Sequence, residues 1–527
     1  MKNLSIRPLT WASAASRRLL SSSPAAALEP SPSTAEIAEK RSLAEVEEDK
    51  NKHKKDFVPA VRCPPARVLA AAGGEACSKT MNQWVREGRP TKAIELVKFV
   101  KDLRKYRRYK HALELMDWMV KIKGMNLSYT NHAIRIDLMS KVKGIESAED
   151  YFSKLPENAK QEQTYGALFS CYCTEKMLDK ALSLYKKMKE LGFASNNLLH
   201  NNLMGLYMKL EQPEKVPIIL KEMKANNLVP DNVTYCIVMN SYAALNDIDS
   251  VERVIQEMED DENSVIQWNA YSTLASIYIS AGHFEKAESA LKKLEGLIDS
   301  RERLPFHFLI SLYASTGNLE EINRVWKSLK ATFVKCTNMS YLTMLQALNK
   351  LDDIEGMKQI YEEWELIHET YDSRLTNVLI SCYLRNDMIE EADSLYMKTK
   401  DKQGKLDFRT CELFMDYYLK KNETGSAMEW LEIASRMAED GEWKLNLEKV
   451  SLFLQHYEKE KDADGIEKFC KILKKLNCLG SGAYKSLIHI YAATDKKDPS
   501  LCKWIKEEKI ELDPETQKLL DKACASK

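Results

Sequence analysis

The sequence repeats itself with a period near 35 residues, and this period constrains the fold more than any other feature. Apolar side chains recur in each repeat at positions 4, 7, 8 and 11, and again at 20, 23, 24 and 27. This spacing marks one face of an amphipathic helix, so each repeat is predicted to be a hairpin of two short helices. The clearest repeats begin at Glu162, Asn197, Asn232, Trp268, Arg303, Asn338 and Ser373.

A single hairpin of this size cannot bury both of its apolar faces, so the hairpins must stack on one another. Fainter repeats begin near Ala93, Tyr129, Phe408, Leu447 and Ser481. We therefore predict an all-α, right-handed superhelical α-solenoid of about twelve two-helix repeats over residues 93–515. Position 11 is tyrosine in most repeats, and we interpret these rings as core packing rather than as platforms for bases.

The two helices of a hairpin are joined near position 15 of the repeat. Gly282 and Gly317 occupy this joint, where a left-handed backbone would end the first helix. Asn246, Asp387 and Asn422 occupy it in other repeats, and these residue types tolerate the same conformation.

The ends of the chain differ from the repeats. Residues 1–28 contain no Asp or Glu but carry Lys2, Arg7, Arg17 and Arg18, which is typical of a transit peptide. The segment Arg17-Arg18-Leu19-Leu20-Ser21 resembles a mitochondrial processing site and favours mitochondria, with the chloroplast as the alternative. Residues 29–78 are predicted to be a disordered linker, 79–92 an N-terminal cap and 516–527 a closing helix.

Composition excludes several other classes of protein. Lys+Arg and Asp+Glu both number 78, so bulk charge cannot hold nucleic acid and any such site must be local. No run of eighteen apolar residues predicts a membrane span. The twelve cysteines form no C-x-x-C pair, so neither a metal nor another cofactor is expected.

The repeats also share particular residues: an aromatic at position 4, Tyr at 11, often Ala at 20, Met at 27 and Pro-Asp at the end. The stretch from Pro230 and Asp231 to Tyr235 shows this clearly, as does Ala181 to Met188. The chain closely resembles the pentatricopeptide repeat family, in the P class of plant organelles, over about four-fifths of its length. The resemblance implies binding of single-stranded RNA at one base per repeat.

In that family, position 5 and the last residue of a repeat contact the base edge, and position 2 sandwiches the base. The resemblance carries these roles to pairs Asn201 with Asp231 and Asn377 with Asp407, which imply two uracils separated by four other bases. It also places Gly166, Asn196 and Asp372 at base-reading positions and Leu198, Val233, Leu304 and Met339 at sandwiching positions. Leu342 and Glu412 depart from the pattern, because Leu342 cannot form a hydrogen bond to a base edge and Glu412 would repel phosphate.

Position 13 lies at the end of the first helix, near the place where the family meets the RNA backbone. It is basic in Lys141, Lys209, Lys350, Arg385, Lys420 and Lys459. These cations are candidates for phosphate contacts. The alternative is that they are solvated helix ends that complement the helix dipole.

Three classes of function follow from these features. The first is a sequence-selective adaptor that binds single-stranded mitochondrial transcripts and acts in processing, stability or translation. The second is a structural component of the mitochondrial ribosome or another ribonucleoprotein, bound to rRNA or ribosomal proteins. A role in catalysis is not expected, because the sequence has no H-x-E with P-C-x-x-C, no Walker A loop and no G-x-G-x-x-G.

Overall fold

The computed structural model describes residues 76–87, 93–121, 124–261, 265–367, 371–401, 407–438, 443–494 and 514–524. These residues form helices and their connections, with no strand among them. None of the helices in this part of the chain is long and apolar enough to cross a membrane. The predicted transit peptide, residues 1–28, and most of the predicted linker, residues 29–78, lie outside the described residues.

The chain forms two compact units, Met1–Leu297 and Ile298–Lys527. The helices of the first unit are α4 (Ala76–Arg86), α5 (Ala93–Lys105), α6 (Tyr109–Lys121), α7 (Tyr129–Lys143), α8 (Ile145–Ser153), α9 (Glu162–Thr174), α10 (Leu178–Glu190), α11 (Asn197–Lys209), α12 (Val216–Ala225), α13 (Asn232–Ala244), α14 (Ile248–Asp260), α15 (Trp268–Ser280) and α16 (Phe284–Gly296). Single 3-10 turns at Glu157–Ala159 and Pro213–Lys215 complete it.

The helices of the second unit continue the same alternation. They are α17 (Leu304–Thr316), α18 (Leu319–Thr332), α19 (Asn338–Lys350), α20 (Ile354–Ile367), α21 (Ser373–Arg385), α22 (Ile389–Asp401), α23 (Phe408–Lys420), α24 (Thr424–Met437), α25 (Leu447–Glu460), α26 (Ala463–Lys475), α27 (Ser481–Ala493) and α29 (Pro514–Cys524). The last of these packs on α27.

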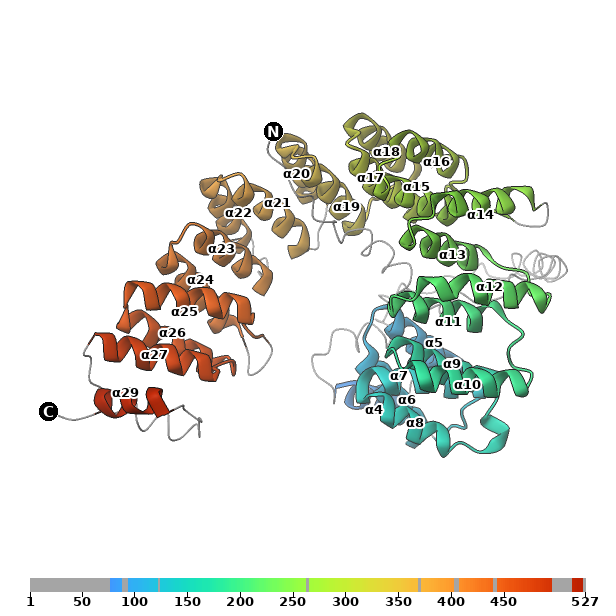
Figure 1. Cartoon of the computed structure of the whole chain (residues 1–527), viewed down its shortest axis with the longest axis horizontal. Helices are drawn as coiled ribbons and strands as arrows, with labels where there is room; N and C mark the ends of the chain where they lie inside the picture. Colours follow the sequence, from blue (N-terminus) through green and yellow to red (C-terminus); the bar gives the residue numbers. More distant parts are fainter. Residues whose placement is uncertain are drawn as a thin grey trace, which may run out of the picture. The chain divides into compact units, whose positions relative to one another are not determined.

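Within each unit, most hairpins stack on the next through their first helices (Figure 1). In the first unit α7 packs on α9, α9 on α11 and α11 on α13, and in the second α17 packs on α19 and α19 on α21. The first helices begin where the repeats were predicted to begin, for example at Glu162, Asn197 and Trp268. This arrangement confirms the predicted all-α solenoid of helical hairpins.

The tyrosines at position 11 lie in the core between hairpins, as predicted. Tyr278, Tyr313 and Tyr491 are buried, while Tyr207 and Tyr242 are half-buried. Their rings therefore fill space between helices, as core residues do.

In ten repeats, the residue at position 15, which joins the two helices of the hairpin, has a left-handed backbone. The predicted residues follow this rule, including Gly282 at φ 80° and Asn246 at φ 57°. Arg107, Lys176, Glu211 and Lys461 also adopt it, at φ between 53° and 59°, although their side chains do not favour it. The turn inside the hairpin therefore requires this conformation whatever residue occupies the joint, and a backbone bond from the next residue closes it, as from Met177 N–H to the Tyr172 carbonyl at 3.0 Å.

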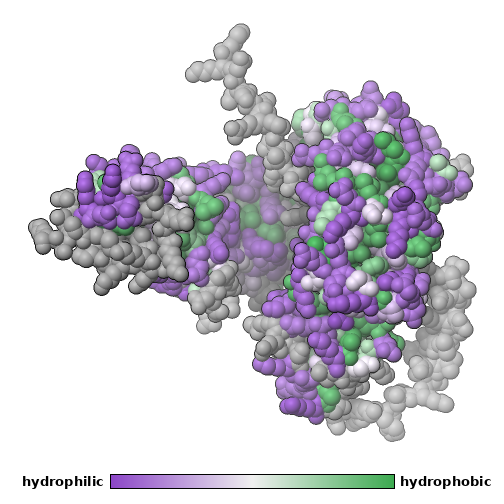
Figure 2. Space-filling model, turned by 60° about the horizontal axis from the view of Figure 1, so that its bottom comes forward, coloured by the Kyte–Doolittle hydropathy of each residue, from purple (hydrophilic) through white to green (hydrophobic). Residues whose placement is uncertain are grey.

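The outer surface mixes polar areas with smaller apolar ones, as the face shown in Figure 2 illustrates. Exposed apolar side chains include Val233 and Met339 from the second positions of two repeats, with exposed fractions of 43% and 44%.

Candidate nucleic-acid interface

In most repeats the last residue is the N-cap of the next hairpin. Asp231 precedes α13 and accepts a hydrogen bond from the backbone N–H of Thr234 at 2.7 Å. Asp407 precedes α23 and accepts from the backbone N–H of Thr410 at 3.1 Å. Asp is favoured at an N-cap because its carboxylate satisfies an amide that the helix leaves unpaired. The two predicted base-reading carboxylates are thus fixed by local helix chemistry.

Asn201, Asp231 and Thr234 form a closed polar triangle that joins two adjacent repeats. The Asn201 amide Nδ2 donates to Asp231 Oδ1 at 3.2 Å. The Thr234 hydroxyl lies 2.8 Å from Asn201 Oδ1 and 2.8 Å from Asp231 Oδ1. The structure therefore brings the first predicted reading pair together and adds a threonine to it.

The second predicted pair has the same geometry in the other unit. Asn377 Nδ2 donates to Asp407 Oδ1 at 2.9 Å, and the Thr410 hydroxyl donates to Asn377 Oδ1 at 2.7 Å. The Ser373 hydroxyl donates to the other oxygen of Asp407 at 2.6 Å. Burial opposes ionisation of Asp407, but the bonds from Ser373, Asn377 and Thr410 outweigh it and lower the pKa of Asp407.

Both asparagines are nearly buried, with 6% of Asn201 and 7% of Asn377 exposed. An amide nitrogen carries two protons and its oxygen two lone pairs, and the triangle uses one of each. What remains is one N–H and one lone pair whose positions are set by the neighbours. Such an amide can recognise only a partner that approaches closely and offers a matching edge.

A related contact occurs where the fifth residue is a histidine. His307 Nε2 lies 2.9 Å from Ser340 Oγ, and Ser340 lies 3.1 Å from Thr337, the last residue of the same repeat as His307. Burial, followed by the nearby Arg303 charge, lowers the pKa of His307 to about 4. The imidazole is therefore neutral near pH 7, and one of its nitrogens can accept a hydrogen bond.

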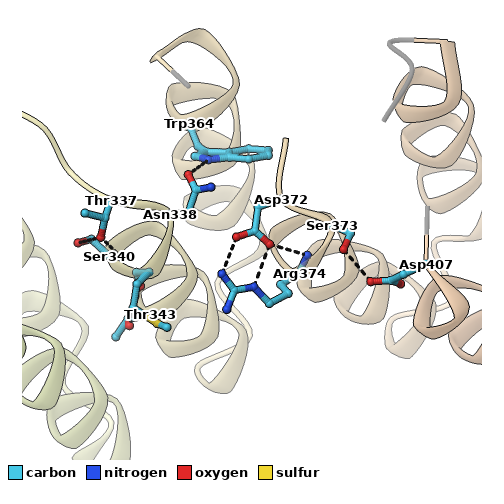
Figure 3. A network of polar contacts seen from close by, with 10 residues as sticks. Thr337, Asn338, Ser340, Thr343, Trp364, Asp372, Ser373, Arg374 and Asp407 are labelled. Atoms are coloured by element: carbon cyan, nitrogen blue, oxygen red, sulfur yellow. Dashed lines mark hydrogen bonds and ion pairs between the residues drawn. The ribbon is translucent and has the colours of Figure 1, made fainter. Parts of the chain in front are cut away.

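Other predicted reading positions are occupied differently. Asp372 forms an ion pair with Arg374 at 2.6 Å, and the bond from Arg374 is the main cause that lowers the pKa of Asp372 (Figure 3). Asn196 accepts from the backbone N–H of Leu199 at 3.1 Å and donates to Glu162, while Gly166 offers no side chain. These repeats lack the triangle that orients Asn201 and Asn377.

The predicted sandwiching residues are accessible. Leu304 is 52% exposed, Val233 and Met339 are exposed to a similar extent, and Leu198 is half-buried. Apolar side chains exposed at this regular position can contact the flat face of a base.

The predicted phosphate-binding residues divide into two groups. Lys209, Lys350 and Arg385 bond to the preceding repeat. Their partners are the Cys173 carbonyl at 3.3 Å, Ser315 Oγ at 2.7 Å and the Asn349 carbonyl at 2.9 Å. Burial lowers the pKa of both Lys209 and Lys350.

The second group has fewer competing contacts. Lys420 is exposed and forms no ion pair with any residue that the structure describes. Lys459 is 82% exposed and its nearest carboxylate, Glu460, is 4.0 Å away. Lys141 is paired with Asp137 of its own helix at 2.7 Å. Lys420 and Lys459 are therefore the two cations at position 13 that are most available to a phosphate.

Sequence reasoning missed Thr234, Thr410 and Ser340, the hydroxyl partners of the fifth residues. All three stand at position 3 of their repeats, three residues after an N-cap. The pattern Asp-x-x-Thr is a capping signal that could have identified the two threonines from sequence. Among the described residues, no group of three or more His, Cys, Asp or Glu side chains could hold a metal ion.

Comparison with known proteins places the chain among repeat proteins of the same period. A model described as "PPR repeat family" matches residues 199–244, and a "PPR repeat" model matches residues 163–193, 233–262, 270–297 and 375–403. The chain is also similar to the maize pentatricopeptide repeat protein PPR10, with 16% identity, a TM-score of 0.44 and coverage of 93% of this chain and 73% of that one.

Relatives in Arabidopsis thaliana are much closer in sequence. Two are named mitochondrial pentatricopeptide repeat-containing proteins, at 40% identity over 86% of this chain and 90% of the relative, and at 42% over 87% and 85%. A third, named large ribosomal subunit protein mL101, is 40% identical over 84% of this chain and 90% of its own length. The names of the first two confirm the mitochondrial assignment. With such identity across nearly the whole of its relatives, the chain belongs to the pentatricopeptide repeat family.

Proposed function

We propose that this protein is an adaptor that binds single-stranded RNA selectively and acts on mitochondrial transcripts, in their processing, stability or translation, without catalysis of its own. The observation that carries the proposal is the polar triangle around Asn201 and its copy around Asn377. Each triangle leaves an amide N–H and a lone pair in a fixed orientation at a position that is slightly open to solvent.

The orientation of the amide supplies a physical basis for choosing uracil. The pairing edge of uracil offers carbonyl acceptors beside an N3–H donor, whereas cytosine offers an amino donor beside an N3 acceptor. A freely rotating asparagine could flip and satisfy either base. In the triangle, the carboxylate holds the amide N–H group on one side and the hydroxyl holds the amide oxygen on the other. A flip would break the bond to Asp407 and turn the amide oxygen toward its carboxylate, a repulsive contact in a buried site, so one base is preferred.

A binding assay tests this proposal directly. An RNA oligonucleotide with two uracils separated by four bases should bind more tightly than the same oligonucleotide with both uracils changed to cytosine. The double variant Asn201→Ala, Asn377→Ala should remove this preference. The matched control is Asn240→Ala, Asn386→Ala, because these amides donate to carbonyls four residues earlier in the chain, at 2.8 and 3.0 Å. Equal affinity of the unmodified protein for both oligonucleotides would refute selective recognition.

A second candidate function is a structural role in the mitochondrial ribosome. The relative named mL101 supports it, as do the repeats whose fifth residue is Gly166, Leu342 or Glu412 and cannot form the triangle. Co-sedimentation separates the candidates. A ribosomal component should remain with the large subunit from mitochondrial lysate after a high-salt wash, whereas a transcript adaptor should be released.

A further inference from the structure

The hairpin of α5 and α6 carries a concentration of positive charge outside the base-reading positions. Residues 98–110 contain seven Lys or Arg residues and one acidic residue, Asp102, a net charge of +6, although the whole chain has a net charge of zero. Four of these cations lie at the turn between α5 and α6. We call Lys105, Arg107, Arg108 and Lys110 the basic turn.

The cations of the basic turn are exposed and unpaired. None of the four forms an ion pair with another residue that the structure describes. Arg104, one residue earlier, differs, because its guanidinium pairs with Asp137 of α7 at 2.7 Å. Each exposed cation of the turn therefore repels its neighbours without a carboxylate to offset the repulsion.

Helix ends do not explain this charge. A cation in the last turn of a helix complements the dipole, and this accounts for Arg104 and Lys105 at the end of α5. Arg107 and Arg108 lie beyond that helix, and Lys110 lies in the first turn of α6, where a cation is unfavourable. The first turn of α6 also contains no acidic residue. The local electrostatic cost indicates a polyanionic partner.

The aromatic residues in the turn indicate that the polyanion is a nucleic acid. Tyr106 is 61% exposed and lies between Lys105 and Arg107 in the chain, so its ring is available to a base while the cations meet phosphates. Guanidinium groups suit phosphate oxygens because they can donate two parallel hydrogen bonds. The ammonium of Lys141 lies 4.8 Å from the ring centroid of Tyr109, which brings the end of α7 beside the turn.

We propose that the basic turn binds the RNA backbone without regard to base sequence, outside the segment that the reading positions select. The identity of the polyanion rests on the proposed RNA-binding function. Charge and stacking at the turn contribute affinity, while the triangles contribute selectivity, because phosphate contacts carry no sequence information.

The test compares two triple variants that each remove three positive charges. The first, Arg107→Gln, Arg108→Gln, Lys110→Gln, neutralises most of the basic turn. The control, Lys186→Gln, Lys221→Gln, Lys292→Gln, neutralises exposed lysines on second helices that likewise have no ion-pair partner among described residues. The probes are a short RNA that covers only the two uracils and the bases between them, and the same RNA extended by about ten adenosines at each end.

The basic-turn variant should bind the extended RNA about tenfold more weakly at low salt, with a salt dependence of log K reduced by about 2, as expected for three lost phosphate contacts. Its preference for uracil over cytosine and its affinity for the short RNA should not change. The control variant should match the unmodified protein on both probes.

Three outcomes decide the matter. Equal binding of the extended RNA by both triple variants overturns the proposal. Loss of binding to phosphatidylserine vesicles with no change for RNA overturns it in favour of a membrane partner. If the unmodified protein ignores the exchange of uracil for cytosine but still needs the basic turn for extended RNA, the selective function fails while this proposal stands.

Discussion

The threonine hydroxyls should control base selectivity without contacting the base. Replacing Thr410 with valine keeps the shape of the side chain but removes the donor that lies 2.7 Å from Asn377 Oδ1. The Asn377 amide then keeps only its bond to Asp407, at 2.9 Å, and its oxygen is no longer held in place. Replacing Thr234 with valine removes the equivalent donor, 2.8 Å from Asn201 Oδ1.

The expected loss of base selectivity follows from the burial of the Asn377 amide. Thr410 is 1% exposed and Asn377 is 7% exposed, so water cannot readily replace the missing donor. Leaving a buried acceptor unpaired costs about 1–3 kcal/mol. This energy measures how firmly the hydroxyl holds the amide oxygen in place, so its loss should reduce the preference for uracil over cytosine by up to about tenfold, since 1.4 kcal/mol corresponds to a factor of ten.

The assay uses fluorescence anisotropy with oligonucleotides in which one uracil at a time is changed to cytosine. Thr410→Val should reduce discrimination at one of the two uracils, and Thr234→Val at the other. Thr343→Val is the control, because this buried hydroxyl donates to the Met339 carbonyl of its own helix at 2.9 Å. Unchanged discrimination at both uracils in the folded threonine variants would refute the orienting role.

Three further predictions concern charge and backbone. Burial lowers the pKa of His307 to about 4 in the folded protein, whereas the unfolded chain takes up this proton below about pH 6.5. His307 therefore contributes stability that is complete above about pH 6.5 and is lost as the pH falls to about 4. His307→Gln should therefore reduce the fall in melting temperature between pH 7 and 4, by an amount equivalent to at most about 3 kcal/mol, and an identical pH profile would contradict this. Lys461→Gly should stabilise the protein by about 0.5–1 kcal/mol in thermal melts, because φ at 461 is 53°, whereas Gly317→Ala, at φ 81°, should destabilise it by about 1 kcal/mol. Lys420→Gln should lower the slope of log K against log salt for RNA binding by about one phosphate contact. Lys209→Gln should lower thermal stability with little effect on this slope, because Lys209 bonds to the Cys173 carbonyl. The reverse pattern would show that the bond to Cys173 contributes no stability.

The fold was predictable because the apolar periodicity of the sequence is strong. First helices begin at Asn197, Asn232 and Ser373, as the 35-residue spacing requires. The joints were predictable where Gly or Asn marked them, but not at Glu211 or Lys461. There the left-handed backbone is required by the turn between the two helices of the hairpin, and the propensity of the residue itself does not reveal it.

The site was only partly predictable, because sequence positions do not show which contacts compete. The resemblance to repeat proteins named Asn201 with Asp231, and the structure shows them bonded, but the burial of the asparagine depends on packing between repeats. Lys209 was predicted to face phosphates, yet it bonds to the carbonyl of Cys173. A charged residue at a periodic position shows which face of the repeat it occupies, but the neighbouring helix determines which group its side chain contacts.

The polar triangle has a consequence for anyone who wishes to reprogram such a protein. A block of 35 residues cut from Asn197 to Asp231 carries the asparagine and the aspartate but leaves Thr234 behind in the following block. Modules exchanged at this sequence boundary would therefore carry the base-reading asparagine and aspartate without the threonine hydroxyl that completes the triangle. Grafts that extend three residues into the next module should transfer specificity more faithfully than grafts that stop at the boundary.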